Sequence, residues 1–301
     1  MKIGFIGLGN MGRRLSQNLL KAGFEVVAYD VDPKAIEKVT ESGAKAAKSP
    51  KEVAQLSDIV ITSLPNDAIV KEVILGRDGC LEEARKGQVF LDMSTVSPTT
   101  TREVAKFVER KGADYLDAPL SGTVDDAQAG TLTILVGGKK DALERVREVL
   151  KPIGPQIHHC GGLGMGNTVK LLNNLIIASY KAALLESFAL GVKIGVDPKR
   201  LYEILITTGA GKWALAQKQL SLVLKSNFEP KFSIDMTYKD LELGSAMAKE
   251  AGAPLLLFNT VNKIYEIARA EGLGKLEGAA IIKVFEKLFN CSIQRAQEKS
   301  E

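Results

Sequence analysis

A lysine and two asparagines interrupt a strongly apolar stretch of the chain, at Lys170, Asn173 and Asn174. In a helix, residues three and four positions apart lie on one face, so both amides would lie within one turn of the lysine. Burial disfavours a charged ammonium group and lowers its pKa toward the range that is useful for proton transfer. Lys170 is therefore a candidate acid or base. A lysine in the first turns of a helix can also extend its amine into water, and the local pattern leaves both interpretations open.

The element that must position these residues is a long helix, which we predict at 167–190 because apolar residues occur on almost every face. At 1.5 Å per residue it would extend roughly 36 Å, long enough to belong to two domains. We therefore expect a first domain at 1–163 and a second at 164–290, with this helix joining them. The polar residues 291–301 are expected to form a flexible tail.

Composition excludes several classes of protein. The 301 residues are 45% hydrophobic and 25% charged, which is typical of a soluble protein with two domains. The net charge is only +4 and no dense basic run occurs, so no nucleic-acid partner is predicted. Three scattered cysteines without C-x-x-C spacing predict no metal site and indicate a reducing, cytoplasmic location. No signal-peptide pattern and no uninterrupted apolar run of membrane-spanning length is found, so no membrane association is expected.

A glycine motif near the start of the chain predicts a nucleotide site. The sequence passes from an apolar strand at 2–6 through G-x-G-x-x-G to a helical pattern and a second strand at 25–29. The first glycine allows a tight turn, the second lets a pyrophosphate approach the backbone, and the third lets helix and strand pack closely. Amides at the helix N-terminus face the phosphates. We therefore predict a dinucleotide-binding loop made of Gly7, Leu8, Gly9, Asn10, Met11 and Gly12.

Asp30 follows the second strand, 23 residues after Gly7. At that place a carboxylate can accept hydrogen bonds from the ribose hydroxyls of a dinucleotide, and it would repel a 2'-phosphate. This favours NAD as the cofactor. Lys34, Arg13 and Arg14 lie close in sequence and can supply positive charge near the ribose, so NADP remains an alternative.

Strands and helices alternate as far as residue 117, which predicts an α/β domain with a parallel, doubly wound sheet. Ligands of such sheets bind at the carboxyl ends of the strands, so the loops that contain Leu64, Pro65 and Thr95 should line the cofactor cleft. Ordinary turn chemistry explains the local sequence of these loops equally well. The expected helices are 33–41, 50–55, 66–73 and 98–110, and the expected strands lie near 44 and at 58–62, 88–91 and 113–117.

A second candidate ligand site follows this region, at Ser121, Gly122 and Thr123. Small residues leave their backbone N–H groups unobstructed, and a helix that begins here would present those amides and the Ser121 hydroxyl to a carboxylate. Simple capping of that helix by Ser121 or Thr123 explains the same residues at least as well.

Four motifs in this order resemble the β-hydroxyacid dehydrogenase family, which includes 3-hydroxyisobutyrate dehydrogenase, tartronate semialdehyde reductase, and the glyoxylate and succinic semialdehyde reductases. The motifs are GFIGLGNMG at 4–12, DAPLSG at 117–122 with AGTLT at 129–133, GMGNTVKLLNN at 164–174, and YKDL at 238–241. The resemblance implies a Rossmann domain followed by an all-helical domain, and NAD(P)-linked oxidation of a hydroxyl β to a carboxylate. It also implies a homodimer or homotetramer.

The resemblance also implies roles for individual residues. Lys170 matches the family's catalytic lysine, Asn174 matches its substrate-binding asparagine, and Asp240 is an acid that orients its neighbours at the substrate. Ser121 and Gly122, with Thr123 beside them, match the cradle for the substrate carboxylate. The remaining matches are contacts to the cofactor, at Leu64, Pro65, Thr95 and Lys239.

We therefore predict NAD(P)-dependent oxidation of a small 3-hydroxy acid, such as 3-hydroxyisobutyrate or serine, to its semialdehyde, with Lys170 as acid and base. Thr123 stands where many family members have a second glycine and is closer to the reductase branch, whereas Asp30 resembles the NAD-using branch. An NADPH-dependent glyoxylate or succinic semialdehyde reductase is thus the alternative. A non-catalytic dinucleotide-binding module is a more distant one, and the presence of Lys170 and Asn174 argues against it.

The chain from 197 to 290 shows apolar residues at helical spacing and no strand alternation. Two interpretations are open for Trp213 and Phe232, a position that faces the substrate cleft and a position in the core of this helical region. The core is expected, because aromatic side chains of helical domains are more often buried there, and neither residue is assigned to the site. The sequence does not indicate which hydroxy acid is used.

Overall fold

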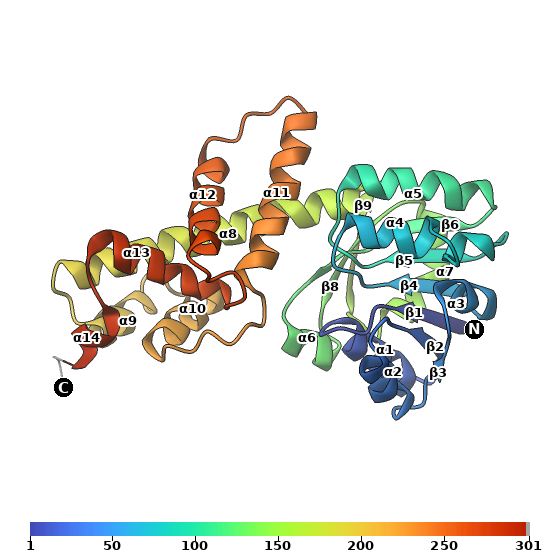
Figure 1. The fold of residues 1–301 in the computed structure, drawn as a ribbon, viewed down its shortest axis with the longest axis horizontal. Helices are drawn as coiled ribbons and strands as arrows, with labels where there is room; N and C mark the ends of the chain where they lie inside the picture. The colour runs from blue at the N-terminus through green and yellow to red at the C-terminus, as the bar shows by residue number, and fades with distance from the viewer. Residues whose placement is uncertain (299–301) are drawn as a thin grey trace. The chain divides into compact units, whose positions relative to one another are not determined.

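The structure is a computed structural model that describes residues 1–298. The chain divides after Lys170 into two compact units, Met1–Lys170 and Leu171–Glu301, which we call the N-terminal and C-terminal units (Figure 1). Each unit has a hydrophobic core of its own.

The N-terminal unit is built on one sheet in which the strands follow the order β3-β2-β1-β4-β5-β6-β8-β7, with β9 paired to β8. From β3 to β6 all neighbours are parallel, which confirms the predicted alternation up to residue 117. These strands are β1 (Lys2–Ile6), β2 (Glu25–Tyr29), β3 (Lys45–Ala46), β4 (Ile59–Thr62), β5 (Val89–Asp92) and β6 (Asp114–Asp117).

Beyond β6 the sheet becomes mixed. Strand β8 (Thr133–Gly137) is antiparallel to β6 and to β7 (Leu120–Ser121), and it is parallel to β9 (Gln156–Gly161). The unit is therefore a Rossmann-like mixed sheet.

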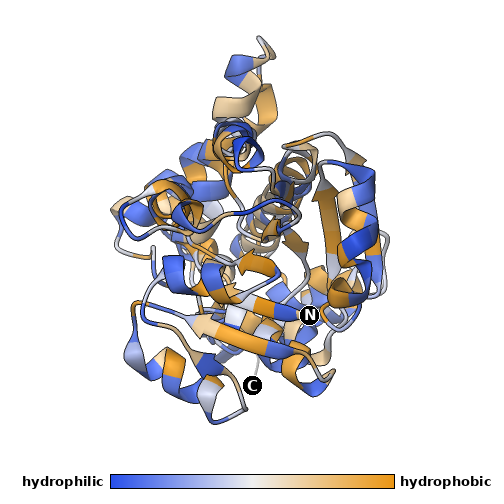
Figure 2. Cartoon of the chain, turned by 90° about the vertical axis from the view of Figure 1, so that its right-hand side faces the viewer, coloured by the Kyte–Doolittle hydropathy of each residue, from blue (hydrophilic) through white to orange (hydrophobic). Residues whose placement is uncertain are grey.

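Helices cover both faces of this sheet, and the central strands β1, β4 and β5 are correspondingly apolar along most of their length (Figure 2). Phe5 and Leu91 belong to the core on one face, whereas Val60 and Phe90 belong to the core on the other. Three helices begin with a capping Asp or Ser followed by proline, which fixes their first turns. The helices are α1 (Gly12–Lys21), α2 (Pro33–Thr40), α3 (Pro50–Leu56), α4 (Asp67–Leu75), η1 (Cys80–Glu82), α5 (Pro98–Arg110), α6 (Val124–Ala129) and α7 (Lys140–Leu150).

Helix α8 (Met165–Lys193) begins in the N-terminal unit and continues into the C-terminal unit as one helix of 29 residues. By length and composition alone it is apolar enough to cross a membrane, but half of its most apolar window is buried inside the molecule. Such burial is expected of a core helix in a globular protein.

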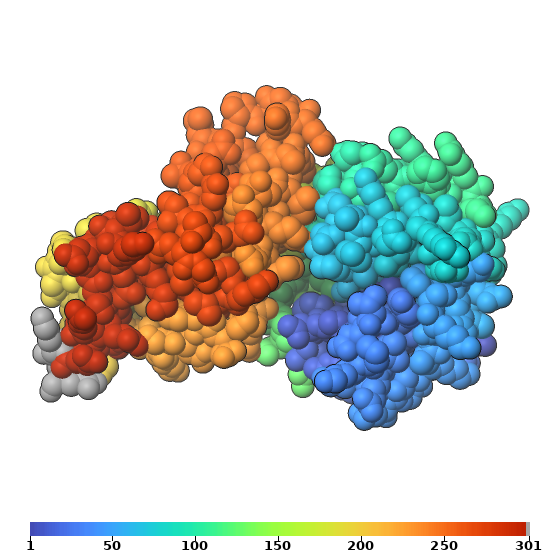
Figure 3. Space-filling view, viewed as in Figure 1, coloured from blue at the N-terminus to red at the C-terminus, as the bar shows by residue number. Residues whose placement is uncertain are grey.

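The described part of the C-terminal unit is helical, as predicted. Its core includes Leu185, Phe188, Tyr265 and Phe285. Figure 3 shows the segment between α11 and α12 on the surface, where residues 249–254 are all exposed. After α8 the helices are α9 (Pro198–Leu205), α10 (Ala214–Leu224), α11 (Ile234–Glu250), α12 (Leu256–Ala270), η2 (Gly278–Ile281), α13 (Ile282–Phe289) and α14 (Ile293–Glu298).

Two features of this unit differ from expectation. Part of the expected flexible tail, 291–301, forms α14, because Ile293 packs into the core and its N–H bonds the Glu286 side chain. Residues 299–301 lie outside the described residues. The expected core position of two aromatic side chains is also wrong, since Trp213 is 47% and Phe232 is 40% exposed.

Candidate active site

The glycine loop has the geometry that its spacing predicts. Gly7 has φ +92°, and a Cβ there would lie 2.3 Å from the carbonyl oxygen of Ser63. A Cβ at Gly12 would lie 1.8 Å from the carbonyl oxygen of Gly7, so the third glycine permits close packing of α1. A Cβ at Gly9 would meet no atom within 4 Å, which leaves the backbone open to a ligand. The loop fits the pyrophosphate of a dinucleotide.

Asp30 lies directly beside this loop. One carboxylate oxygen accepts the N–H of Leu8 at 2.5 Å, and the other accepts the N–H of Asp32 at 2.8 Å. Arg14 donates to the carbonyl oxygen of Asn10, within the same loop, at 2.6 Å. The carboxylate thus holds the glycine loop, and its predicted contact with a ribose stays a prediction.

A buried carboxylate at the end of β5 organises the next two loops. Asp92 Oδ1 accepts the Thr62 hydroxyl at 2.8 Å and the Ser94 N–H at 3.0 Å, and Oδ2 accepts the Tyr115 hydroxyl at 3.2 Å. The Ser94 hydroxyl oxygen in turn accepts the N–H of Leu64 at 2.8 Å. Burial raises the pKa of Asp92 to about 6 in spite of these hydrogen bonds.

This network ties together the loops that carry the three predicted cofactor contacts after β4 and β5. Leu64 and Thr95 are half-buried and Pro65 is exposed. The loop after β4 is linked to the loop after β5 through Ser94, so both are held at the same edge of the sheet. Their contact with a cofactor stays a prediction.

The region expected to cradle a carboxylate is a helix cap in part. Thr123 is the N-cap of α6, and its N–H and hydroxyl donate to Asp126 at 2.6 and 2.7 Å in a capping box. The Thr123 amide thus donates to Asp126 in this structure, and a contact of Thr123 with substrate stays a prediction. Ser121 is half-buried in β7, and Gly122 has φ +142°. Binding of a substrate carboxylate by these two residues stays a prediction.

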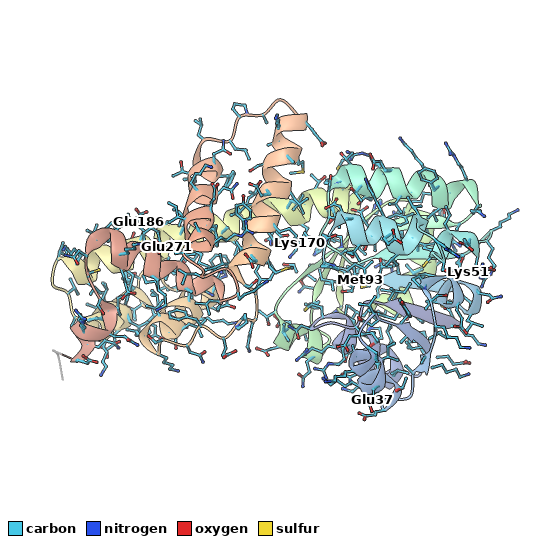
Figure 4. The ribbon with its side chains drawn as sticks, in the orientation of Figure 1. Glu37, Lys51, Met93, Lys170, Glu186 and Glu271 are labelled. Atoms are coloured by element: carbon cyan, nitrogen blue, oxygen red, sulfur yellow. The ribbon has the colours of Figure 1, made fainter. Side chains whose placement is uncertain are left out.

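Helix α8 carries Lys170, labelled in Figure 4, and Asn174 one turn later. Lys170 is half-buried. Within the C-terminal unit, Asn174 Nδ2 donates to Asp240 Oδ2 at 2.6 Å, and Asn173 donates to Asn174 Oδ1 at 3.2 Å. Lys239 Nζ lies 3.2 Å from the other carboxylate oxygen of Asp240, which is 3% exposed. Three predicted site residues of this unit are thus brought together, with the carboxylate at their centre.

Sequence reasoning missed two buried residues near the start of α8. Asp117 and Asn167 are both 0% exposed and bond one another, because the Asn167 N–H donates to Asp117 Oδ2 at 2.8 Å. Burial raises the pKa of Asp117, and the backbone N–H groups that it accepts offset part of this effect. Asp117 lies in the motif at 117–122 and Asn167 in the motif at 164–174, so the motifs themselves could have identified both residues.

A glycine loop that fits a pyrophosphate, at the strand ends of a Rossmann-like sheet, defines a dinucleotide-binding protein. A lysine and an asparagine one turn apart on α8 add groups that can move a proton and hold a hydroxyl, as oxidoreductases of hydroxy compounds require. Among residues 1–298, no cluster of three or more His, Cys, Asp or Glu side chains is suited to a metal ion.

Comparison with known proteins agrees with this class. The family model described as the NAD binding domain of 6-phosphogluconate dehydrogenase matches residues 2–162. A second family model, described as NAD-binding of NADP-dependent 3-hydroxyisobutyrate dehydrogenase, matches residues 164–285. The chain is 40% identical over 297 residues to 2-(hydroxymethyl)glutarate dehydrogenase of Eubacterium barkeri, covering 99% of each chain. It is 36% identical to 3-hydroxyisobutyrate dehydrogenase of Pseudomonas aeruginosa, covering 94% of this chain and 98% of the other.

Solved structures give the same result. The structure of Mycobacterium tuberculosis 3-hydroxyisobutyrate dehydrogenase with L-serine has a TM-score of 0.84 at 33% identity, covering 94% of this chain and 98% of the other. The Salmonella typhimurium 3-hydroxyisobutyrate dehydrogenase structure has a TM-score of 0.86 at 28% identity, covering 94% and 99%. The chain belongs to the 3-hydroxyisobutyrate dehydrogenase family of β-hydroxyacid dehydrogenases, and the resemblance inferred from its motifs is confirmed. It is an NAD(P)-dependent oxidoreductase that acts on the CH–OH group of a small hydroxy acid.

Proposed function

We propose that this enzyme oxidises the primary hydroxyl of a 2-substituted 3-hydroxypropanoate to the semialdehyde, with NAD as the preferred oxidant. Three compounds named with relatives share this skeleton: 3-hydroxyisobutyrate, 2-(hydroxymethyl)glutarate and L-serine. In each, the carbon next to the carboxylate bears a CH₂OH group and one further substituent, which is methyl, carboxyethyl or amino. The enzyme would therefore distinguish these substrates by the substituent at carbon 2.

The observation that carries the proposal is the pairing of Lys170 and Asn174 on one face of α8. Asn174 Nδ2 is fixed by Asp240 and has a second hydrogen to donate to the substrate's hydroxyl oxygen. Lys170 accepts the hydroxyl proton during oxidation and returns it during reduction. A bound nicotinamide supplies the hydride acceptor.

The preference for NAD rests on Asp30. Its carboxylate is held at the glycine loop by Leu8 and Asp32, where it would repel the 2'-phosphate of NADP. Asp30→Asn keeps an acceptor for the Leu8 N–H but removes the charge. We expect this variant to lower the ratio of kcat/KM for NAD to that for NADP by about tenfold. An unchanged ratio would show that Asp30 does not select the nucleotide.

The test of the reaction is nicotinamide absorbance with 3-hydroxypropanoates that bear hydrogen, methyl, amino or carboxyethyl at carbon 2, each with NAD and with NADP. Lys170→Arg should lower kcat by roughly 100-fold or more, because an arginine cannot release its proton at neutral pH. Lys193→Arg on the same helix is the matched control and should leave kcat unchanged. Because a base must be neutral to accept a proton, the rate of oxidation by the wild type should rise with pH.

Two outcomes would contradict the proposal. Activity of Lys170→Arg within a few-fold of the wild type would remove the lysine from the mechanism. Reduction of glyoxylate or succinic semialdehyde with NADPH, without oxidation of any 3-hydroxypropanoate, would assign the enzyme to the reductase branch instead.

A further inference from the structure

The first turn of α8 is capped by a side chain from a distant strand. Asp117, at the end of β6, accepts the N–H of Gly164 on Oδ1 and the N–H of Asn167 on Oδ2, both at 2.8 Å. Backbone N–H groups at the start of a helix have no partner within the helix, and a carboxylate there also interacts favourably with the helix dipole. The carboxylate therefore holds the start of α8 against the end of β6.

Close approach of the backbone is needed for this cap. A Cβ at Gly137 would lie 2.4 Å from Asp117 Oδ1, and a Cβ at Gly166 would lie 2.9 Å from Oδ2 and 2.3 Å from the Leu135 carbonyl oxygen. Both positions thus exclude any side chain. The cap is a closely fitted contact, and the two glycines are part of it.

Asn167 extends the contact to the loop after β5. Its Oδ1 accepts the N–H of Val96 at 3.1 Å, and its Nδ2 donates to the Thr101 hydroxyl of α5 at 3.3 Å. Val96 directly follows Thr95, a predicted cofactor contact. Asn167 is therefore bonded to Asp117 through its backbone and to this loop through its side chain.

We propose that Asp117 and Asn167 are positioning residues that set Lys170 relative to the cofactor-binding loops of the N-terminal unit. This inference rests on the catalytic role proposed above for Lys170, which lies three residues after Asn167 on the same helix. Apolar packing has no preferred direction, whereas these hydrogen bonds fix the rotation and the axial position of the first turns of α8, at 165–170, within the N-terminal unit. A misplacement of about 1 Å at a reacting group can cost roughly 100-fold in rate.

The test compares two buried asparagines of the same unit. Asn167→Ala should lower kcat for oxidation by at least about tenfold, with the NADH dissociation constant changed by less than about threefold. Asn18 is the control. Its Nδ2 also makes a buried hydrogen bond, to the carbonyl oxygen of Ala127 at 2.8 Å, but neither residue belongs to α8. Asn18→Ala should lower the melting temperature to a similar extent and leave kcat unchanged. Equal kcat values for the two variants would overturn the proposal.

A double-mutant cycle separates this proposal from the function on which it rests. If Asn167 acts through Lys170, Asn167→Ala should have no further effect on kcat in a Lys170→Ala background. If the fold-loss in kcat of the double variant equals the product of the two single fold-losses, Asn167 acts independently of Lys170, and the positioning role is overturned. An active Lys170→Ala variant would instead reject the proposed function.

Two milder variants keep the proposal testable if Asn167→Ala does not fold. Thr101→Val removes only the partner of Asn167 Nδ2, and Asp117→Asn retains one acceptor for the two amides. Both should lower kcat more than they raise KM for the hydroxy acid. Wild-type kcat in both folded variants would overturn the proposal.

Discussion

Buried polar groups in two regions of the molecule differ in whether they have hydrogen-bond partners. In the N-terminal unit, Asp92, Asp117 and Asn167 are fully buried, and each makes at least three hydrogen bonds or accepts at least two backbone N–H groups. In the C-terminal unit, Tyr265 Oη and Gln219 Oε1 are buried without a hydrogen-bond partner among the described residues. Directional bonds thus hold the strand-end loops and the start of α8, where position matters for a ligand.

Hydrogen-bonded polar groups fix the positions of their neighbours more narrowly than apolar contacts do. The C-terminal unit also has paired polar groups: Glu277, which is 4% exposed, accepts the N–H groups of Lys231 and Phe232, and the partly buried Asn174 donates to Asp240. Removing one partner from a satisfied buried pair leaves the other without its bond, whereas removing an unpartnered polar atom leaves nothing behind. Substitutions of paired buried groups should therefore cost more stability than substitutions of unpaired ones.

The largest effect is expected at Asp117. Asp117→Ala leaves the N–H groups of Gly164 and Asn167 buried and unpaired, so the free energy of unfolding should fall by roughly 3–5 kcal/mol. Chemical denaturation of the purified variant measures this. The exposed Asp141 is the control, and Asp141→Ala should cost less than about 1 kcal/mol. If both variants lose less than about 1 kcal/mol of unfolding free energy, the two hydrogen bonds of Asp117 do not stabilise the fold as predicted.

Asp92 should make stability depend on pH. Its pKa is raised from 3.8 to about 6 in the folded chain, so the folded chain holds the proton more tightly than the unfolded one. This contribution to stability is complete below about pH 4 and is lost as the pH rises through about 6, by at most about 3 kcal/mol. Asp92→Asn keeps the acceptor for Thr62 and Ser94 and removes the titration. The difference in unfolding free energy between variant and wild type should therefore grow in favour of the variant from pH 4 to pH 7. A constant difference would show that Asp92 has an ordinary pKa.

A matched pair of tyrosines gives the smallest and sharpest test. Tyr115 and Tyr265 are both buried, and burial raises the pKa of both. The Tyr115 hydroxyl donates to Asp92, whereas the Tyr265 hydroxyl has no hydrogen-bond partner within residues 1–298. Tyr115→Phe should lower the free energy of unfolding by roughly 1–2 kcal/mol, because a charged acceptor loses its donor. Tyr265→Phe should change it by less than about 0.5 kcal/mol or increase it. Equal losses in thermal or chemical unfolding would remove the contrast between paired and unpaired hydroxyls.

Local patterns predicted most of the N-terminal unit. The glycine spacing predicted the conformations of Gly7 and Gly12, and the helix at 98–110 has the predicted bounds. The capping role of Thr123 was one of two open interpretations, and Asp126 three residues later was the available signal for a capping box.

The contacts that were not predicted join distant residues or depend on packing. The bonds of Asp117 to α8 span 47 and 50 positions, and no periodicity shows which amides a carboxylate will reach. The helix at Ile293–Glu298 forms in a polar sequence because the Ile293 side chain packs into the core of the C-terminal unit. The exposure of Trp213 was equally hidden, because composition does not show which aromatic side chains a core will accept.

The cap of α8 also has a consequence for the order of synthesis. Asp117 leaves the ribosome 50 residues before Asn167, which corresponds to roughly 2.5–10 s at ordinary rates of translation. During this interval strands β1 to β6 can pair, but the carboxylate at the end of β6 lacks both of its amide partners. The nucleotide-binding fold is therefore complete only after the first turn of α8 has been made, and a fragment that ends at residue 162 would leave this acid buried without its cap.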